Sequence, residues 1–278
     1  MAARIRQDLL ANPSAVRSIG SLGTAYFAAA FIAASAMALL WDRDLALSFF
    51  VHTALWMLAS FGFVTLGIGL LRDRHGHRLS GLQLPLALTL LRIALVPAIT
   101  LFLVERHFLP ALLIYVIAAL TDVFDGMLAR RWDQTTELGK VLDPLVDIAF
   151  NLAMLAGLAA ADMIAMWVFW VGVARYGILL VGGVSLHLFV GPIRIEPTLF
   201  GRLTGVVMTS LIALYTLLLG VRGELAHRLT PLTEVALGVL LSATVVQVLL
   251  LGWFNLRVLR GQAREASRVV DDVDWRAG

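Results

Sequence analysis

The feature that most constrains the fold of this chain is a succession of long apolar segments separated by short polar links. Eight segments are long enough to cross a membrane as helices of roughly 20 residues each. We place them near residues 23–41, 46–71, 86–104, 109–130, 138–160, 163–186, 203–221 and 232–255. A mean hydropathy of +0.87 excludes an ordinary soluble domain. The sequence therefore predicts an all-α, polytopic integral membrane protein, a helical bundle with about eight transmembrane helices.

The first apolar segment is predicted to stay in the protein. It begins after about 22 residues, and no small-residue cleavage site follows it, so it is typical of a retained span rather than a signal peptide. The chain contains no cysteine, which excludes disulfides and thiolate metal sites.

The placement of basic residues predicts the orientation in the membrane. If the N-terminus is cytoplasmic, fifteen of the 22 Lys and Arg residues fall on the cytoplasmic side. These are Arg4, Arg6, Arg17, Arg72, Arg74, Arg78, Arg130, Arg131, Arg194, Arg202, Arg257, Arg260, Arg264, Arg268 and Arg276. Only Arg43, Arg106, Arg222 and Arg228 fall on the other side, and the remaining three, Arg92, Lys140 and Arg175, lie within or at the ends of spans. This asymmetry predicts that both termini are cytoplasmic.

Four of the five aspartates between residues 122 and 147 interrupt the apolar pattern, and the fifth, Asp133, falls in a polar loop. Asp122 and Asp125, three residues apart near the end of the fourth segment, share one helix face at 100° per residue. Asp143 and Asp147, four residues apart near the start of the fifth segment, also share a face. A short loop joins the two segments, so the four carboxylates are predicted to converge just inside the cytoplasmic membrane boundary. Acidic residues at such a depth are functional by default.

Carboxylates gathered in this way predict a site for hard cations. Four like charges in a low-dielectric site repel one another, and divalent cations relieve that repulsion. All-oxygen ligation without Cys or His favours Mg²⁺ or Mn²⁺, and we expect two ions. Small residues on the same faces, Gly126, Ala129 and Gly139, would let a nucleotide diphosphate approach the backbone beside Arg130. An ion or proton pathway is the alternative function for the same carboxylates.

The segment from residue 122 to residue 147 reads D-x2-D-G-x2-A-R-x8-G-x3-D-x3-D. This pattern resembles, without a gap, the signature of the CDP-alcohol phosphatidyltransferase family. The matching positions are Asp122, Asp125, Gly126, Ala129, Arg130, Gly139, Asp143 and Asp147. The flanking stretches "QTTELGKVLDPLVD" and "LPLALTLLRIALVP" resemble the bacterial phosphatidylglycerophosphate synthase branch of the family. In the second stretch the matching positions are Pro85, Thr89, Arg92 and Pro97.

The resemblance implies a membrane enzyme of phospholipid biosynthesis. Such an enzyme transfers a phosphatidyl group from CDP-diacylglycerol to an alcohol and releases CMP. Carried over by position, Asp122, Asp125, Asp143 and Asp147 would bind the metal ions, and Asp147 would also be the general base. The nucleotide-binding residues would be Asp122, Gly126, Ala129, Arg130 and Gly139, joined by Thr89 and Arg92. A homodimer in contact with membrane lipid is expected from the family, and no nucleic-acid partner is expected.

The resemblance also predicts how the chain is divided. A six-helix family core would span 81–256, preceded by an N-terminal segment with two extra transmembrane helices (1–80). A basic cytoplasmic tail would follow (257–278). The localisation expected is a bacterial inner membrane, with the active site on the cytoplasmic side. A cation transporter fits less well, because there is no convincing internal repeat and the aspartates gather at one depth.

The acceptor alcohol is predicted from three arginines. Arg175 lies mid-span, where an unpaired arginine costs about 3 kcal/mol, and Arg194 and Arg202 lie in or beside the next cytoplasmic loop. Together they would hold the phosphate of an acceptor such as glycerol 3-phosphate. Inositol phosphate and an unphosphorylated alcohol such as serine are the alternatives. The chain departs from the branch pattern at Leu86, Ile148 and Tyr176.

Overall fold

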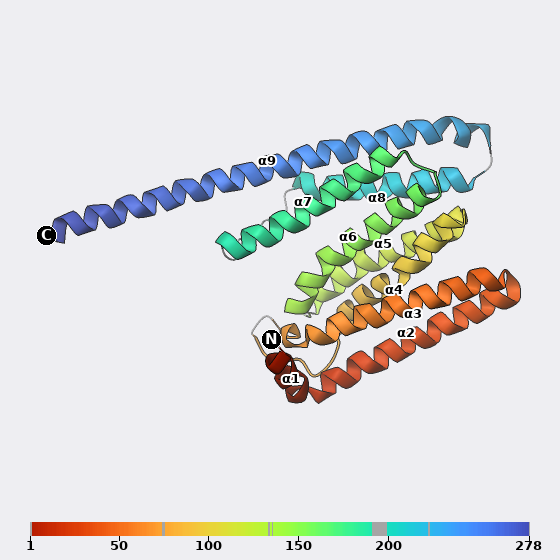
Figure 1. Cartoon of the computed structure of the whole chain (residues 1–278), viewed down its shortest axis with the longest axis horizontal. Coiled ribbons are helices and arrows are strands. Elements are labelled where there is room, and N and C mark those ends of the chain that lie inside the picture. Colours follow the sequence, from red (N-terminus) through yellow and green to blue (C-terminus); the bar gives the residue numbers. More distant parts are fainter. Residues whose placement is uncertain are drawn as a thin grey trace. The chain divides into compact units, whose positions relative to one another are not determined.

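The computed structural model describes residues 2–73, 76–132, 134, 136–190, 199–221 and 223–277. Helices make up almost all of this part of the chain (Figure 1). They are α1 (Ala2–Ala11), α2 (Pro13–Leu40), α3 (Arg43–Leu66), the short 3₁₀ helix η1 (Ile68–Leu70), α4 (Leu84–Val104), α5 (Phe108–Arg131), α6 (Glu137–Ala160), α7 (Met166–Val190), α8 (Leu199–Gly220) and α9 (Glu224–Ala277).

The helices confirm the prediction of an all-α, polytopic membrane protein. Among the described residues, seven helices are long and apolar enough to cross a membrane, and Met166–Gly182 of α7 forms a shorter apolar helix. Together they correspond to the eight predicted segments. Only helices satisfy every backbone polar group within a single segment, which is why apolar runs of this length are a reliable signal.

The boundaries of the first two spans differ from the prediction. The helix of the first span begins at Pro13, ten residues before the predicted edge at residue 23, because Asn12 caps it: the Asn12 side chain accepts from the Ala15 N–H at 3.4 Å. Asparagine at the cap and proline in the first turn both favour a helix start, and hydropathy detects neither. The second helix ends at Leu66 rather than near residue 71, and Gly67 and η1 turn the chain away.

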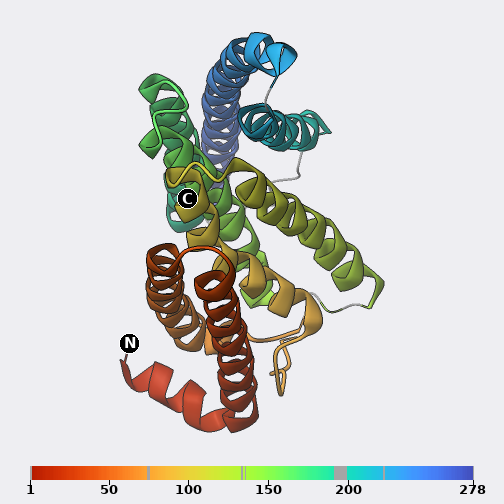
Figure 2. The same ribbon diagram turned by 90° about the vertical axis from the view of Figure 1, so that its right-hand side faces the viewer.

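The chain divides into two compact units. Unit 1 comprises Met1–Ala165 and Ile212–Thr230, and unit 2 comprises Met166–Leu211 and Pro231–Gly278. In unit 1, α4 packs against α5 and α6, while α2 lies beside α3 and α3 beside α4 (Figures 1 and 2). In unit 2, the Trp167 ring of α7 lies close against Gly238 of α9.

An apolar cluster joins the N-terminal spans to the helices of the family-like segment within unit 1. It contains buried residues from α2, α3, η1, α4 and α6, together with one from the link after η1. These are Ala15, Ile19, Val64, Ile68, Leu71, Leu86, Leu90, Leu138 and Leu142. The predicted N-terminal segment is therefore packed directly against the helices that begin the predicted core.

The approach of α6 to α4 depends on a glycine, which yields a first prediction. A Cβ at Gly157 would lie 2.8 Å from the Leu103 Cβ and 3.3 Å from the Thr100 carbonyl oxygen. We expect Gly157→Ala to destabilise the protein by about 1–3 kcal/mol, because overpacking outweighs the better helix propensity of alanine. Gly20→Ala is the matched control, since nothing lies within 4 Å of its added Cβ. The thermal denaturation midpoints of the two purified variants check this, and equal midpoints would contradict it.

Candidate active site

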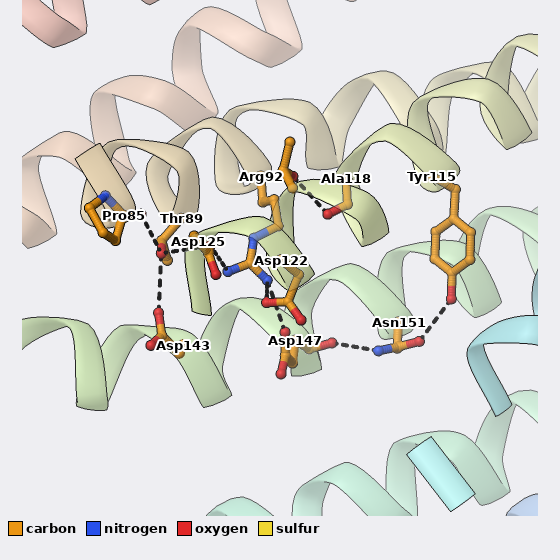
Figure 3. Close-up of polar contacts among 11 residues, drawn as sticks. Pro85, Thr89, Arg92, Tyr115, Ala118, Asp122, Asp125, Asp143, Asp147 and Asn151 are labelled. Carbon is orange, nitrogen blue, oxygen red and sulfur yellow. Dashed lines mark hydrogen bonds and ion pairs between the residues drawn. The ribbon is translucent and has the colours of Figure 1, made fainter. Parts of the chain in front are cut away.

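Six polar side chains from three neighbouring helices of unit 1 meet at one place (Figure 3). They are Thr89 and Arg92 of α4, Asp122 and Asp125 of α5, and Asp143 and Asp147 of α6. The predicted spacings put each aspartate pair on one face, and the structure turns the two faces toward each other. Arginine and threonine from α4 complete the group.

Arg92 is the centre of this group. Its side chain is only 3% exposed, and its guanidinium reaches from α4 into the space between α5 and α6 (Figure 3). Nη2 donates to Asp125 at 2.8 Å, and Nη1 donates to Asp147 at 3.2 Å and also to Asp122. A buried arginine in a membrane helix is costly unless it is paired, and here three carboxylates share it.

Thr89 links the fourth carboxylate to the others. Its hydroxyl oxygen lies 3.1 Å from an Asp143 oxygen, 3.5 Å from an Asp125 oxygen and 3.2 Å from the Pro85 carbonyl oxygen. A hydroxyl has a single proton to donate, so Thr89 serves one of these acceptors at a time. The nearest, Asp143, is therefore the carboxylate that Thr89 orients best.

The carboxylates differ in their access to the surroundings. The Asp125 side chain is 9% exposed and lies against Arg92, whereas Asp122 and Asp147 are 45% and 56% exposed. Asp125 is therefore suited to fix Arg92 in place. Asp122 and Asp147 are open to an incoming molecule.

A polar chain next to the site joins α5 to α6 and was missed at the level of the sequence. The Asn151 side-chain amide donates to the Asp147 carbonyl oxygen at 2.9 Å, and the Tyr115 hydroxyl donates to Asn151 Oδ1 at 3.2 Å. Tyr115 also stacks on Phe150, with ring centroids 5.4 Å apart. Asn151 lies four residues after Asp147, on the same helix face, which is the signal that could have found it.

The first turn of α6 forms the other side of the site. Thr136 caps this helix by accepting from the Gly139 N–H at 2.9 Å. A Cβ at residue 139 would lie 3.0 Å from the Thr136 hydroxyl oxygen, so glycine keeps the cap uncrowded. The Glu137 N–H donates to the Arg72 carbonyl oxygen at 3.2 Å, which attaches the link after η1 to the start of α6.

A hollow of about 70 Å³ opens beside the carboxylates. It is lined by Pro85, Leu86, Thr89, Asp125, Gly126, Gln134, Thr136, Gly139, Lys140 and Asp143. Gly126 and Gly139, which the sequence analysis assigns to a nucleotide cradle, both line this hollow. Gln134, Thr136 and Lys140 were not singled out by the sequence pattern. The Gln134 Oε1 atom is buried, and it has no hydrogen-bond partner within the described residues.

Several predicted site residues are only partly described. Ala129 and Arg130 lie in α5 and Arg202 lies in α8, but the side chains of all three are outside the described part, and Arg194 is outside it altogether. Arg175 lies in α7 of unit 2, where its guanidinium carbon is 4.6 Å from the centroid of the Tyr176 ring. Its Nε atom is buried without a hydrogen-bond partner within the described residues. The acceptor site stays a prediction.

The donor set suits a hard divalent cation, although the carboxylates are arranged around an arginine. Within the described ranges, no three Asp, Glu or His side chains are grouped closely enough to share an ion. The reason is that the Arg92 guanidinium lies among Asp122, Asp125 and Asp147. Four ionised carboxylates and one guanidinium give the group a formal charge of −3. The atoms that could bind a metal ion are all oxygens. That chemistry fits Mg²⁺ or Mn²⁺.

Comparisons with known proteins match the segment that holds the site. A family model described as CDP-alcohol phosphatidyltransferase matches residues 82–254. A CDP-diacylglycerol–glycerol-3-phosphate 3-phosphatidyltransferase of Aquifex aeolicus is 31% identical over 125 residues, covering 44% of this chain and 69% of the relative.

Two further relatives match over shorter stretches. A protein of the same name from Pectobacterium atrosepticum is 46% identical over 101 residues, covering 30% of this chain and 53% of the relative. A cardiolipin synthase (CMP-forming) of Streptomyces coelicolor is 41% identical over 71 residues, or 26% of this chain and 33% of that protein. No solved structure matches.

Proposed function

Because the chain belongs to the CDP-alcohol phosphatidyltransferase family, we propose that it transfers the phosphatidyl group of CDP-diacylglycerol to glycerol 3-phosphate and releases CMP. The chain is an integral membrane protein and an enzyme of the phosphatidyltransferase class. One observation carries the proposal: within the segment that matches the family, four aspartates lie on facing sides of α5 and α6, three paired with Arg92 and the fourth, Asp143, bonded to Thr89. The relatives from Aquifex and Pectobacterium support glycerol 3-phosphate as the acceptor.

Asp147 is the group best suited to take the proton of the acceptor. It is the more open of the two exposed Arg92-bound carboxylates, and its backbone carbonyl accepts from Asn151, which is bonded in turn to Tyr115 of α5. The hydroxyl oxygen of the acceptor attacks the phosphorus that bears diacylglycerol, the bond from that phosphorus to the CMP oxygen breaks, and Asp147 receives the proton. A base so placed contributes roughly 10²–10⁴-fold to the rate.

The metal site is part of the proposal. Asp122, Asp125, Asp143 and Asp147 would hold two Mg²⁺ or Mn²⁺ ions, whose chemistry is to offset the charge of the diphosphate and of the departing CMP. Arg92 holds three of these carboxylates together, and Thr89 orients the fourth. The remaining charge is what draws cations to this place.

The nucleotide would lie over the hollow beside the carboxylates. Gly126 and Gly139 let it approach the backbone of α5 and α6, and Gln134 offers a buried acceptor without a partner within the described residues. The family resemblance implies that Ala129 and Arg130 would also contact the nucleotide. The exposed apolar side chains of Val123, Phe124 and Met127 lie on α5 beside Asp122 and Asp125, which suits the acyl chains of the donor.

The acceptor phosphate would be held by Arg175, Arg194 and Arg202. A second reaction is favoured by a specific observation: the 41% identity to a cardiolipin synthase (CMP-forming) supports cardiolipin synthesis with release of CMP as the alternative. The distribution of basic residues supports termini and a site on the cytoplasmic side. A homodimer completes the proposal, as the family resemblance implies.

A panel of acceptors tests the proposal directly. Purified protein with CDP-diacylglycerol and Mn²⁺ or Mg²⁺ is given glycerol 3-phosphate, phosphatidylglycerol, inositol phosphate or serine, and CMP release is measured. We expect glycerol 3-phosphate to give the highest kcat/KM, and removal of divalent ions by a chelator to stop the reaction. No CMP release with any acceptor would overturn the proposal.

A variant extends the panel to the acceptor residues. Arg175→Gln should raise the KM for glycerol 3-phosphate while leaving the KM for CDP-diacylglycerol unchanged. Arg228→Gln is the control, because Arg228 is an exposed residue paired with Glu224 on α9. An unchanged KM in the Arg175 variant removes Arg175 from the acceptor site. Thermal stabilisation by CMP with Mn²⁺ separates the enzyme from a cation transporter, which has no reason to bind CMP.

A further inference from the structure

Helix α4 lacks one of its backbone hydrogen bonds, at the residue that follows Arg92. Pro97 lies inside this helix. Proline has no N–H group, so the carbonyl oxygen of the residue four positions earlier, Ile93, loses its helical donor. Ile93 directly follows Arg92 in the sequence. In a membrane helix no water is available to satisfy such a carbonyl, and leaving it unpaired is costly.

A tryptophan from outside the family-matched segment supplies the missing donor. The indole Nε1–H of Trp56, on α3, donates to the Ile93 carbonyl oxygen at 2.8 Å. Helix α3 packs beside α4 in unit 1 (Figure 1). The Trp56 side chain is 39% exposed, so it lies at the edge of the unit rather than in its core. Its indole N–H group, in contrast, points inward to the Ile93 carbonyl oxygen, which Pro97 leaves without a helical donor.

A second N-terminal helix contacts α4 on the other side of the site residues. The Tyr26 hydroxyl, on α2, donates to the Ala87 carbonyl oxygen at 2.8 Å. Tyr26 is held in turn by an edge-to-face contact with Phe61 of α3, with ring centroids 6.1 Å apart. Side chains of α2 and α3 therefore bind the α4 backbone at residues 87 and 93, and Thr89 and Arg92 lie between these two points.

We propose that Trp56 is a positioning residue of the active site, which holds α4 so that Arg92 meets the aspartates of α5 and α6. Tyr26 supports the same stretch of helix from its other end. The two N-terminal spans are then a working part of the enzyme, although they precede the segment that defines the family. The inference rests on the proposed function, because it is that function which makes the group around Arg92 an active site.

The geometry around Arg92 leaves little tolerance for movement of α4. Its guanidinium is almost completely buried and donates to three carboxylates on two other helices at once. A small shift of the α4 backbone would therefore lengthen more than one of the hydrogen bonds between Arg92 and the carboxylates. Misplacement of a site by about 1 Å costs up to roughly a hundredfold in rate, and a local loosening costs less.

The test uses the chemistry of Pro97 to separate positioning from simple packing. Trp56→Phe removes the N–H donor and keeps an aromatic ring. We expect it to lower kcat by about tenfold with little change in either KM. In a Pro97→Ala background, the introduced alanine supplies a backbone N–H to the Ile93 carbonyl, so Trp56→Phe should then lower kcat less than about twofold. Equal losses in the two backgrounds would overturn the proposal, because loss of packing is not repaired by a backbone donor.

A control variant tests whether the loss of kcat is specific to Trp56 or follows from removing any exposed indole. Trp170→Phe changes an exposed tryptophan in α7 that contacts Phe169, and it should leave kcat unchanged. The thermal midpoint of Trp56→Phe should stay near that of the unsubstituted protein. A loss of kcat in Trp170→Phe as large as that in Trp56→Phe would contradict a specific role for Trp56.

Hydrogen–deuterium exchange provides a readout that does not depend on turnover. Trp56→Phe should speed exchange in peptides from α4, because the side-chain hydrogen bond that holds the Ile93 carbonyl of that helix is lost. The same substitution should change exchange little in the Pro97→Ala background, and unchanged exchange in both backgrounds would refute the positioning role. If the protein released no CMP from CDP-diacylglycerol, the proposed function would fail, and the exchange data would still decide whether Trp56 holds α4.

Discussion

Asp147→Asn is expected to lower the rate of CMP release from CDP-diacylglycerol by about a hundredfold to ten-thousandfold. Asparagine has the shape of aspartate, but it cannot accept the proton of the attacking hydroxyl. The backbone contact from Asn151 to the carbonyl of residue 147 does not involve the carboxylate, so the helix should keep its form. The measurement is the steady-state rate with a saturating acceptor.

Two controls make this result specific. The first control is Asp162→Asn, which removes the same charge from the turn after α6. Asp162 has φ 57°, a conformation that asparagine adopts readily. The activity of this variant should therefore equal that of the unsubstituted protein. Rates are also measured at rising Mn²⁺ concentration. A variant that is defective only in ion binding recovers as Mn²⁺ is raised, whereas a missing base does not. A loss of less than tenfold would remove Asp147 as the base.

Arg92→Leu is expected to cost both stability and activity. It leaves Asp122, Asp125 and Asp147 facing one another without the cation that they share. Breaking a buried ion pair by removing one partner costs about 3–5 kcal/mol. Because the uncompensated charge of the site grows, Mn²⁺ should raise the thermal midpoint of this variant more than that of the unsubstituted protein. Activity should fall by at least about a hundredfold, since the carboxylates lose their arrangement.

The controls for Arg92 are a second arginine and a conservative change. Arg78→Leu removes an arginine from an ion pair with Asp8 of similar length, 2.8 Å, but Arg78 is 43% exposed. An exposed pair of this kind is worth less than about 1 kcal/mol, so the midpoint should hardly move. Arg92→Lys keeps the positive charge but loses the planar guanidinium group that reaches several carboxylates at once. Compared with Arg92→Leu, it should restore stability more fully than activity. Equal midpoints for Arg92→Leu and Arg78→Leu would contradict the central role of Arg92.

Features with a local cause could be predicted most closely. The α5 and α6 aspartates are three and four residues apart, and the helical period alone puts each pair on one face. The start of α2 at Pro13 was placed too late, because the prediction followed hydropathy and the cap at Asn12 is a hydrogen-bonding signal. Asn151 follows the same period, but its role depends on the Tyr115 hydroxyl of another helix, and the period of α6 alone does not predict that contact.

The pairing of Arg92 with the aspartates could not be predicted from the sequence. The family resemblance assigned Arg92 to the nucleotide, and the structure pairs it with carboxylates 30, 33 and 55 residues away. Spacing along one helix contains no information about which neighbouring helix presents its arginine to the site.

The sequence by itself determined the membrane helices, the two carboxylate faces and the family. The physical reasons are that a hydrocarbon layer admits only helices in runs of this length and that side chains three or four residues apart share a face. The tertiary structure decided what those faces meet. Packing of α4 against α5 and α6 placed Arg92 among the aspartates, and packing of α3 against α4 brought Trp56 to a carbonyl 37 residues further along the chain. Such contacts depend on how helices lie against one another, and no local pattern in the chain specifies that.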